Sequence, residues 1–515
     1  MTFTPGELVE LRCEGVAHGG WCVARPPGLP VVFVRHALPG ELVRARVTEV
    51  TSALARAEAV EILDASPDRV EPPCPSARPG GCGGCDWQHA TLPAQRALKA
   101  AVVSEQLRRL AGVDRAVTVE ALPPDGQDAG PAAAGEDAAG EDATSGEEAA
   151  GLGWRTRVQF AVGPDGLAGL RAHRSHEVID IGDCLIAHPG LRDLGIPRRR
   201  WPGATSVEAA VAPAIPAEPG DPAAAGWPEE GGAEEGGADA GGAAGVPETA
   251  VIVVRGGHER RGRERPGRGG PGTGREAAPG RGRTREEAAI QEQVAGLPAG
   301  SVLARDGRKL TPVRGRPYLT QRAAGRDWRV SAGAFWQVHP AAADTLTAAV
   351  LAALEPKPGD SVLDLYCGAG LFAGALAAAV GPQGTVIGLE SDEAAVRDAR
   401  HNLREYRWAR VHRGDVATAA RAAGGRGRES GQAGLPPARL VVADPPRTGL
   451  DRAVIGYLSA GESGVERFAY VSCDPATLAR DIGLLLARGW SLDGLRAFDA
   501  FPMTHHVECV AVLAR

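Results

Sequence analysis

The stretch SVLDLYCGAGLFAGALA (361–377) has the pattern of a buried strand, a glycine turn and a helix of small residues. Gly368 and Gly370 in the turn let a ligand approach the backbone closely. A second apolar strand follows in TVIGLESD (385–392). It ends in Glu390, about twenty residues past the glycines, where an acid can bond the ribose hydroxyls of a nucleoside cofactor. We therefore expect an α/β fold with a Rossmann-like sheet.

The glycine turn also indicates the kind of cofactor. It has G-x-G but not the full G-x-G-x-x-G of a pyrophosphate binder. S-adenosylmethionine, which has no pyrophosphate, fits this turn better than NAD does. An ordinary α/β crossover without a ligand has the same pattern, so the interpretation depends on the rest of the chain.

A lone cysteine, Cys473, follows an apolar strand in YVSCDPATLARD (470–481). Asp474 is a good N-cap, Pro475 suits the first helical position, and the pattern predicts a helix to about Arg488. The helix dipole at that position favours a thiolate, so Cys473 is a candidate nucleophile. The alternative is a small buried hydrophobic residue, which is the usual role of a single cysteine.

Two further segments place acids near this cysteine. Asp444 follows the apolar strand ARLVVA (438–443), at the carboxyl edge where open α/β sheets bind ligands. Glu508 lies in HVECVAVLA (506–514), a predicted buried strand, and an acid there contradicts the pattern unless it faces a site. A salt-bridged core glutamate is the alternative.

Four motifs in this order, DLYCGAGLF, DPPRTGLD, SCDPATLARD and HVE, closely resemble those of the RNA 5-methyluridine methyltransferases. The resemblance is to the 23S ribosomal RNA uracil-C5 branch, which carries an iron–sulfur cluster, and it covers most of the chain. It implies a class I methyltransferase domain with Cys473 as nucleophile and Glu508 as base. The residues that it and the glycine turn assign to S-adenosylmethionine are Gln337, Tyr366, Gly368, Gly370, Glu390 and Asp444. This chain departs from some relatives at Leu371 and Asp474, where they have Asn.

The implied chemistry requires these residue types. Carbon 5 of uracil is too weak a nucleophile to take a methyl group from a sulfonium, but a thiolate that adds to carbon 6 creates an enolate. Cys473 would supply the thiolate, and Glu508 would later remove the proton from carbon 5. Arg447 could orient the uracil or a phosphate. The expected activity is methyl transfer to carbon 5 of a uridine, in 23S ribosomal RNA or alternatively in transfer RNA.

Other classes explain less of the sequence. A radical S-adenosylmethionine enzyme would need a C-x3-C-x2-C loop, which this chain lacks. A cytosine-C5 enzyme would have cysteine directly after proline, but here Asp444 precedes two prolines. A non-catalytic RNA-binding protein would account for the arginines but not for Cys473 and Glu508.

Residues 1–62 alternate short apolar strands with glycine and proline turns, which predicts a small β-barrel. The segment resembles a TRAM domain, an OB-like barrel that binds RNA. With few aromatic residues besides Trp21 and Phe33, phosphate contact is favoured over base stacking. The candidate arginines are Arg12, Arg25, Arg35, Arg44 and Arg46, whereas Cys13 and Cys22 are predicted to be core residues.

PPCPSARPGGCGGCDWQHA (72–90) holds Cys74, Cys82 and Cys85 in a glycine-rich loop. A cytoplasmic chain argues against disulfides, so the spacing indicates a metal site, and by itself it favours zinc slightly over an iron–sulfur cluster. The family resemblance reverses that preference. It implies a 4Fe-4S cluster whose fourth ligand is Cys184.

The central region is interrupted. A helix is expected over 92–112, and WRTRVQFAVG (154–163) and the segment 168–181 are expected to form strands, whose arginines Arg155, Arg157, Arg171 and Arg174 could contact RNA phosphates or simply face solvent. Residues 124–150 and 212–290 have little apolar periodicity and are predicted to be disordered insertions. Between two parts of the second insertion, TAVIVV (249–254) has the pattern of an ordered strand.

The 515 residues suffice for three domains, which we place at 1–62, 63–330 and 331–515. The net charge of −7 includes eight acids and no Lys or Arg in each of 124–150 and 216–248, so without these sixteen acids −7 becomes +9. A modestly basic body is in keeping with an RNA partner. With no signal-peptide pattern and no apolar run near eighteen residues, we expect a cytoplasmic monomer that does not interact with membranes.

Overall fold

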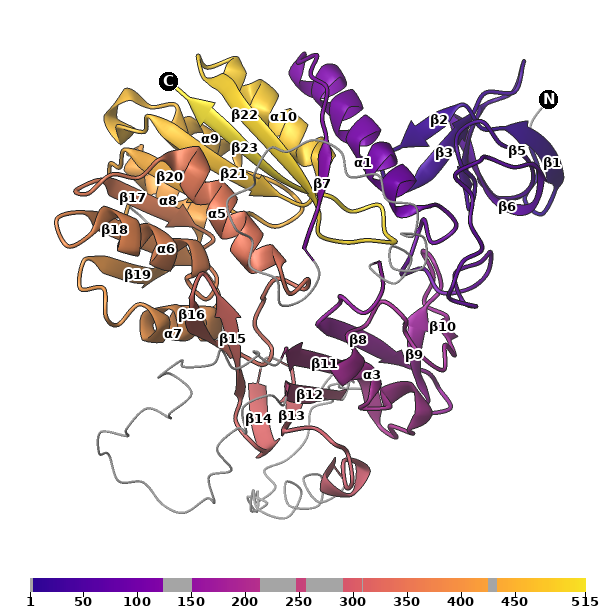
Figure 1. Cartoon of the computed structure of the whole chain (residues 1–515), viewed down its shortest axis with the longest axis horizontal. Helices are drawn as coiled ribbons and strands as arrows, with labels where there is room; N and C mark the ends of the chain where they lie inside the picture. Colours follow the sequence, from indigo (N-terminus) through magenta and orange to yellow (C-terminus); the bar gives the residue numbers. More distant parts are fainter. Residues whose placement is uncertain (1–2, 124–150, 214–246, 256–289, 308, 425–432) are drawn as a thin grey trace, which may run out of the picture.

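The structure is a computed structural model, and it describes residues 3–123, 151–213, 247–255, 290–307, 309–424 and 433–515. The insertion predicted at 124–150 lies outside the described residues, as does most of the one predicted at 212–290. The described chain forms an N-terminal β domain, a central sheet and a C-terminal α/β sheet, shown in Figure 1 in colours from indigo to yellow.

The N-terminal domain is a six-stranded sheet in the order β1-β5-β6-β4-β3-β2 (Figure 1). Inward-facing apolar residues fill its core, among them the two predicted core cysteines, Cys13 and Cys22. The predicted N-terminal β domain is thus confirmed. Its strands are β1 (Leu8–Arg12), β2 (Gly15–Ala17), β3 (Trp21–Ala24), β4 (Val31–Arg35), β5 (Leu42–Val50) and β6 (Leu54–Asp64).

After the cysteine-rich loop, the chain forms α1 (Leu92–Gln106), which continues as a π-helical turn (Leu107–Ala111). The hydroxyl of Thr91 caps α1, and the turn ends at Gly112, whose φ of 68° suits glycine. These elements confirm the helix predicted over 92–112.

The central sheet has seven strands in the order β10-β9-β8-β11-β12-β13-β14. Its neighbours are antiparallel except for β12 and β13, which are parallel. The predicted strand TAVIVV is confirmed as the core of β12, buried between β11 and β13. The elements of this part are β8 (Arg157–Val162), β9 (Ala168–Arg171), β10 (Val178–Ile179), α3 (Pro189–Arg192), the 3-10 turn Ile196–Arg198, β11 (Ala204–Ala212), β12 (Glu248–Arg255), β13 (Ser301–Asp306) and β14 (Lys309–Arg314).

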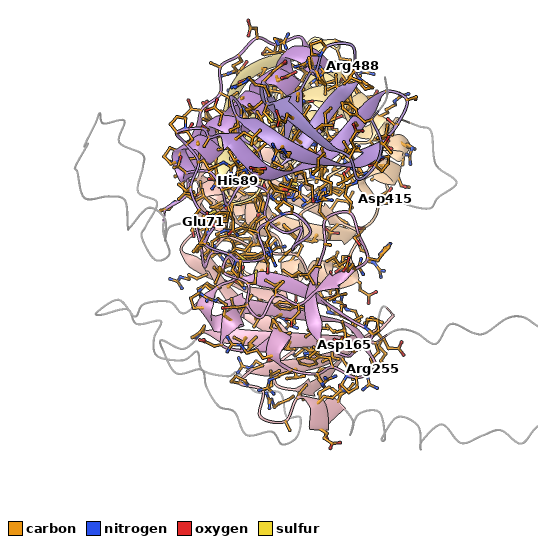
Figure 2. The ribbon with its side chains drawn as sticks, turned by 90° about the vertical axis from the view of Figure 1, so that its right-hand side faces the viewer. Glu71, His89, Asp165, Arg255, Asp415 and Arg488 are labelled. Atoms are coloured by element: carbon orange, nitrogen blue, oxygen red, sulfur yellow. The ribbon has the colours of Figure 1, made fainter. Side chains whose placement is uncertain are left out.

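Figure 2, turned by 90° from Figure 1, shows Asp165, in the turn between β8 and β9, and Arg255, at the end of β12, well below His89. A hairpin of β15 (Tyr318–Ala323) and β16 (Arg326–Ser331) leads from the central sheet into the C-terminal domain. Trp328 of this hairpin is fully buried, and a Cβ atom on Gly374 would lie only 2.4 Å from its ring. Close packing therefore explains why α6 contains a glycine.

The C-terminal sheet has the order β19-β18-β17-β20-β21-β23-β22-β7, and β23 is antiparallel to its neighbours. Apolar clusters cover both faces, with α5, α6 and α7 on one and α8, α9 and α10 on the other. This confirms the predicted Rossmann-like fold class. The elements are α5 (Ala342–Leu354), β17 (Ser361–Leu365), α6 (Leu371–Val380), β18 (Thr385–Glu390), α7 (Glu393–Asn402), β19 (Ala409–Arg413), α8 (Val416–Ala423), β20 (Leu440–Ala443), α9 (Arg452–Leu458), the 3-10 turn Gly461–Ser463, β21 (Arg467–Ser472), α10 (Pro475–Leu486), β22 (Ser491–Asp499) and β23 (Glu508–Ala514).

The segment before the first insertion joins the C-terminal sheet. Strand β7 (Val119–Ala121) pairs in parallel with the edge strand β22. Lys99 of α1 is fully buried, and its ammonium group lies 2.5 Å from a carboxylate oxygen of Asp499. Among the described residues, no helix is long and apolar enough to cross a membrane.

Candidate active site

Cys473 lies between the buried strand β21 and helix α10. The side chain of Asp474 accepts hydrogen bonds from the backbone N–H groups of Ala476 (3.0 Å) and Thr477 (2.9 Å), and Pro475 opens the helix. These contacts confirm the predicted cap and helix start, although the helix ends at Leu486. Cys473 is therefore held at the positive end of the helix dipole.

Glu508 is the first residue of β23 and only 4% of it is exposed. In the register of β21 and β23, Ser472 lies opposite Cys509, so the next position brings Cys473 beside Glu508. The sequence separates these two residues, but the antiparallel pairing of their strands brings them together.

The surroundings of Cys473 and Glu508 disfavour the charged form of both side chains. Burial, followed by the charge of Glu508, raises the pKa of Cys473 to about 12, whereas Arg447 lowers it. Burial and the neighbouring Asp444 also raise the pKa of Glu508 well above its usual value, and Arg447 again opposes the shift. The guanidinium of Arg447 thus favours the charged form of both candidate catalytic groups.

The glycine turn and the acid after β18 form one structure. Gly368 and Gly370 have φ angles of 53° and 91°, and Tyr366 has a φ of 65°. The Gly368 N–H donates to a Glu390 carboxylate oxygen at 3.1 Å, while the other oxygen accepts from the N–H groups of Ser391 and Asp392. The structure therefore brings Tyr366, Gly368 and Glu390 together at the carboxyl edge of the sheet, where open α/β sheets bind their ligands.

Two aspartates line the same edge. Asp364, at 0% exposure, accepts a hydrogen bond from the Ala373 N–H, and its other oxygen has no partner in the described structure. Asp444 follows β20, and burial raises its pKa to about 7. A polar ligand bound beside the glycine turn could donate a hydrogen bond to this unpaired oxygen of Asp364.

Gln337 lies buried in the segment between β16 and α5. The central domain holds this segment, because the N–H and hydroxyl of Thr156 both donate to the Val338 carbonyl. Arg157 donates to the carbonyls of Ala332 and Ala334. In the described structure no hydrogen bond joins Gln337 to Glu390 or to Asp444.

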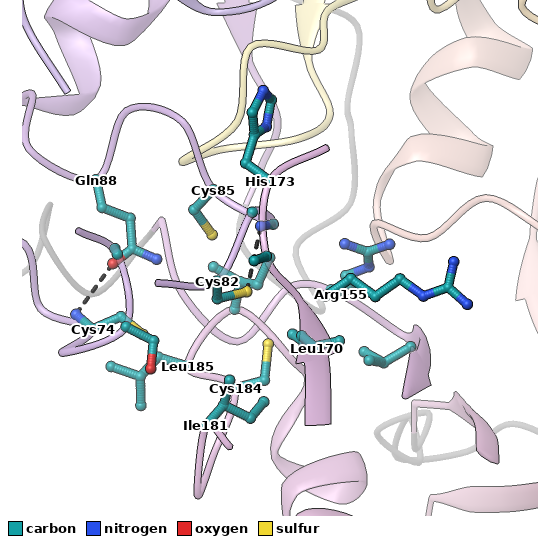
Figure 3. Close-up of a pocket in the computed structure, with 18 of the residues that line it drawn as sticks. Cys74, Cys82, Cys85, Gln88, Arg155, Leu170, His173, Ile181, Cys184 and Leu185 are labelled. Atoms are coloured by element: carbon teal, nitrogen blue, oxygen red, sulfur yellow. Dashed lines mark hydrogen bonds between the residues drawn. The ribbon is translucent and has the colours of Figure 1, made fainter. Parts of the chain in front are cut away.

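The four predicted cysteine ligands Cys74, Cys82, Cys85 and Cys184 line a single cavity of about 470 Å³, and Figure 3 shows the labelled thiols around one space. The loop geometry needs glycine, since a Cβ atom on Gly83 would lie 2.7 Å from the backbone of His173. The Gly84 N–H approaches the sulfur of Cys82 at 3.3 Å.

The described residues include no group of three or more His, Cys, Asp or Glu side chains arranged to hold a metal ion. In a 4Fe-4S cluster each thiolate binds a different iron, so the four sulfurs stand farther apart than the ligands of a single ion. The four cysteines around one cavity supply the number of thiols that such a cluster requires. Burial raises the pKa of Cys184 to about 11, and Arg155 opposes this shift.

Two of the arginines predicted to contact RNA are withdrawn from solvent, Arg35 as a whole and Arg157 at its guanidinium nitrogens Nε and Nη2. Arg35 is 3% exposed and pairs with Asp86 (3.2 Å) and Glu58 (3.7 Å). Arg157 donates to backbone carbonyls, and burial lowers its pKa to about 10. The prediction of phosphate contact is wrong for both, because the guanidinium groups bind carboxylates or backbone carbonyls inside the protein.

Residues 317–515 match the tRNA (Uracil-5-)-methyltransferase family, and residues 2–60 match the TRAM domain. An uncharacterized RNA methyltransferase of Streptomyces coelicolor is 44% identical over 510 residues, which cover 99% of this chain and 93% of that protein. The chain belongs to the RNA methyltransferases, and residues 317–515 are its uracil-5-methyltransferase domain. Another uncharacterized RNA methyltransferase, from Bifidobacterium longum, is 32% identical and covers 98% of this chain and 96% of its own length. The family match makes this protein an S-adenosylmethionine-dependent RNA uracil-5-methyltransferase.

A solved structure has the same fold as this chain. The tRNA (uracil-54, C5)-methyltransferase of Pyrococcus abyssi, in complex with S-adenosyl-L-homocysteine, aligns with a TM-score of 0.59 and 19% identity. The alignment covers 99% of this chain and all of that one. At this identity the likeness shows a common fold.

Sequence reasoning missed a group of residues at the seam between the barrel and the RNA methyltransferase domain. His18 lies 3.3 Å from Asp474, and Asp86 binds both Arg35 and His505. Asp86 and His505 are 419 positions apart. A sequence signal did exist in the polar run THH (504–506) shortly before a buried strand, but it does not identify the partner.

Proposed function

We propose that this enzyme transfers a methyl group to carbon 5 of a uridine in 23S ribosomal RNA, with Cys473 as nucleophile and Glu508 as general base. The observation that supports this most directly is the position of Cys473 beside Glu508 across β21 and β23, with Arg447 opposing the raised pKa of both. A salt-bridged core glutamate, the alternative for Glu508, would have a basic partner at bonding distance. Among the described residues Glu508 forms no such ion pair, and the basic group whose charge acts on it is Arg447.

The residues act in a fixed order. Cys473 gives its proton to solvent and its sulfur bonds to carbon 6, while the electrons of the carbon 5–carbon 6 double bond move toward the O4 oxygen. Bound S-adenosylmethionine would supply the methyl group to carbon 5 and leave as S-adenosylhomocysteine. Glu508 then takes the proton from carbon 5, the double bond re-forms, and the bond between sulfur and carbon 6 breaks. Cys473 is thereby released as a thiolate.

The donor site in this proposal is the carboxyl edge of the sheet. Glu390, which already accepts from Gly368, would bind the ribose hydroxyls, and the turn at Gly368 and Gly370 would pass beside the cofactor. The remaining residues assigned to it are Gln337, Tyr366 and Asp444.

Cys74, Cys82, Cys85 and Cys184 would hold a 4Fe-4S cluster. Uracil methylation transfers no electrons, so the cluster would shape the loop rather than take part in the reaction. The TRAM domain and the exposed arginines would bind RNA phosphates, and the enzyme would act as a monomer in the cytoplasm.

Covalent trapping tests the mechanism. Glu508→Gln should add to RNA and accept the methyl group but stall as an adduct, which gives a denaturation-resistant protein–RNA band. The double variant Cys473→Ala/Glu508→Gln should give no band. RNA with 5-fluorouridine should trap the wild type, because fluorine cannot leave as a cation. Full turnover by Cys473→Ala would refute the mechanism, and an enzyme that only bound RNA would form no band at all.

The substrate is tested separately by mapping 5-methyluridine in ribosomal and transfer RNA from a deletion strain. We expect one position of 23S ribosomal RNA to lose its methyl group, and complementation with the intact gene should restore it. Loss from transfer RNA alone would overturn the choice of substrate and leave the mechanism standing.

A further inference from the structure

The loop 500–507 connects β22 to β23 and ends at the residue before Glu508. Its shape is set by a segment from the N-terminal part of the chain. The Met503 carbonyl accepts from the N–H groups of Asp86 (3.0 Å) and Trp87 (3.1 Å), and the Met503 N–H donates to the side chain of Gln95 (2.7 Å). Met503 is held there with a φ of 68°, an uncommon value for a non-glycine residue.

Asp86 is the centre of these contacts. It is 7% exposed, and one carboxylate oxygen pairs with Arg35 of the barrel at 3.2 Å. The other accepts from the His505 backbone N–H (3.2 Å) and lies 2.6 Å from His505 Nδ1. The barrel turn packs directly on this pair, since a Cβ atom on Gly20 would lie 2.9 Å from the Asp86 Cβ and 3.1 Å from the His505 Cβ.

The contacts continue from His505 to the active site. The rings of His505 and His506 have centroids 4.1 Å apart, and His506 Nε2 lies 3.3 Å from a guanidinium nitrogen of Arg447. Burial, and then the charges of His505 and Arg447, lower the pKa of His506 to about 3. The ring is therefore neutral at physiological pH, and its Nε2 can accept a hydrogen bond from Arg447.

Arg447 is the end of this chain of contacts and the group that matters for the chemistry. The charges that face Cys473 are those of Glu508, Asp444, Asp474 and Arg447, and of these only the Arg447 guanidinium favours the thiolate. Arg447 is itself exposed, so its side chain needs an anchor to stay in place. The acceptor that His506 offers is such an anchor.

We propose that Asp86 is a positioning residue for the methylation reaction, which acts through His505 and His506 to hold Arg447 beside Cys473 and Glu508. This inference rests on the proposed function of Cys473 and Glu508. It also gives the segment after the cysteine-rich loop a defined task, because Asp86 directly follows Cys85.

A purely structural role for Asp86, in docking the barrel, needs a matched control. Glu41 offers one, because it is also a buried carboxylate at the junction between barrel and linker. It binds Arg69 at 2.5 and 2.7 Å and accepts from the backbone of Leu38 and Ser66, but the described structure shows no bond from it to the loop 500–507. Glu41→Gln and Asp86→Asn therefore remove comparable charges, and only the second loosens His505.

The experiment uses the full-length enzyme and an RNA oligonucleotide that contains 5-fluorouridine, and it follows the rate of covalent adduct formation across pH at saturating RNA and S-adenosylmethionine. For Asp86→Asn we expect the rate at neutral pH to fall about tenfold and the profile to move to higher pH by about one unit, because the thiolate becomes harder to form. The affinity for S-adenosylmethionine and the iron content should not change. Glu41→Gln should keep the wild-type profile.

His506→Phe is the second variant, because it keeps an aromatic ring on the loop while removing the acceptor for Arg447. It should show the same alkaline displacement, and it decides the question if Asp86→Asn does not fold. A wild-type pH profile in either variant, or an equal loss in Glu41→Gln, would overturn the role of Asp86 alone. A wild-type enzyme that forms no adduct would overturn the proposed function, and this inference with it.

Discussion

His18 Nε2 lies 3.3 Å from a carboxylate oxygen of Asp474, so a turn of the TRAM barrel touches the residue that follows Cys473. The other oxygen of Asp474 caps α10. Burial alone would raise the pKa of Asp474, but the hydrogen bonds from His18 and Thr477 outweigh it and lower the pKa to about 2. The barrel is thus part of the wall of the active site.

Asp474→Asn should separate the charge of this residue from its role as a cap, because Asn and Asp cap helices about equally well. A lowered pKa stabilises the fold above the ordinary value of 3.8, and that stabilisation is lost as the pH falls toward 2. We expect the variant to be less stable by about 1 kcal/mol at pH 7 and to converge with the wild type between pH 4 and pH 2. Denaturant unfolding measures this, with Asp474→Ala as the variant that also loses the cap. A difference that stays constant with pH would contradict the assignment.

Asp444→Asn should have the opposite pH dependence. Burial raises the pKa of Asp444 to about 7, so its contribution to stability is fully present below pH 3.8 and is lost as the pH rises through 7. Without cofactor, the variant should be the more stable protein at pH 8, by at most about 4 kcal/mol, and should match the wild type at pH 4. Melting temperatures across this range test the sign, and affinity for S-adenosylmethionine should fall. A wild type that gains stability between pH 4 and pH 7 relative to the variant would show that the carboxyl is ionised in the fold.

Lys99→Met should be strongly destabilising, because it leaves the carboxylate of Asp499 buried without a partner. Breaking a buried ion pair costs about 3–5 kcal/mol, whereas replacing both members often costs little. Lys99→Met/Asp499→Leu should therefore recover much of the melting temperature. Arg44→Met, which removes an exposed ion-pair partner in the barrel, serves as the control and should change stability little. Equal losses in the single and double variants would mean that packing, not charge, dominates.

The cysteine-lined cavity predicts a metal content. Anaerobically purified enzyme should be brown and contain about four irons per chain, and Cys82→Ser or Cys184→Ser should lose both colour and iron. Cys13→Ala, in the barrel core, should keep them. Metal analysis and visible absorption provide the readouts. Stoichiometric zinc without iron would contradict the cluster assignment.

Local patterns were enough to predict the elements that carry the site. The glycine turn after β17, the acid that ends β18 and the Asp474 cap each depend on fewer than about twenty neighbouring residues, because turn and cap preferences are local. The buried strand that begins at Glu508 was likewise visible as an acid in an apolar run. The fold class and the candidate catalytic residues follow from such signals.

Contacts between distant segments were not predictable in this way. Arg35 and Arg157 lie in segments with the sequence pattern of solvated strands. Arg35 is nevertheless buried against Asp86, and Arg157 donates to the backbone carbonyl of Ala334, which lies far along the chain. The bond between Asp86 and His505 depends on how the barrel docks, and no periodicity encodes that docking. A single sequence indicates that a polar residue needs a partner but not which residue supplies it.

The pairing of β7 with β22, together with the ion pair of Lys99 and Asp499, has a consequence for dissection of the chain. The family match covers residues 317–515, but we do not expect this segment to be stable when it is isolated from the rest of the chain. Without β7, the edge of β22 would be free to pair with a strand of another molecule. Without Lys99, the buried carboxylate of Asp499 would have no counterion. We expect such a fragment to aggregate. The smallest segment that folds cooperatively is therefore longer than the segment that the family match defines.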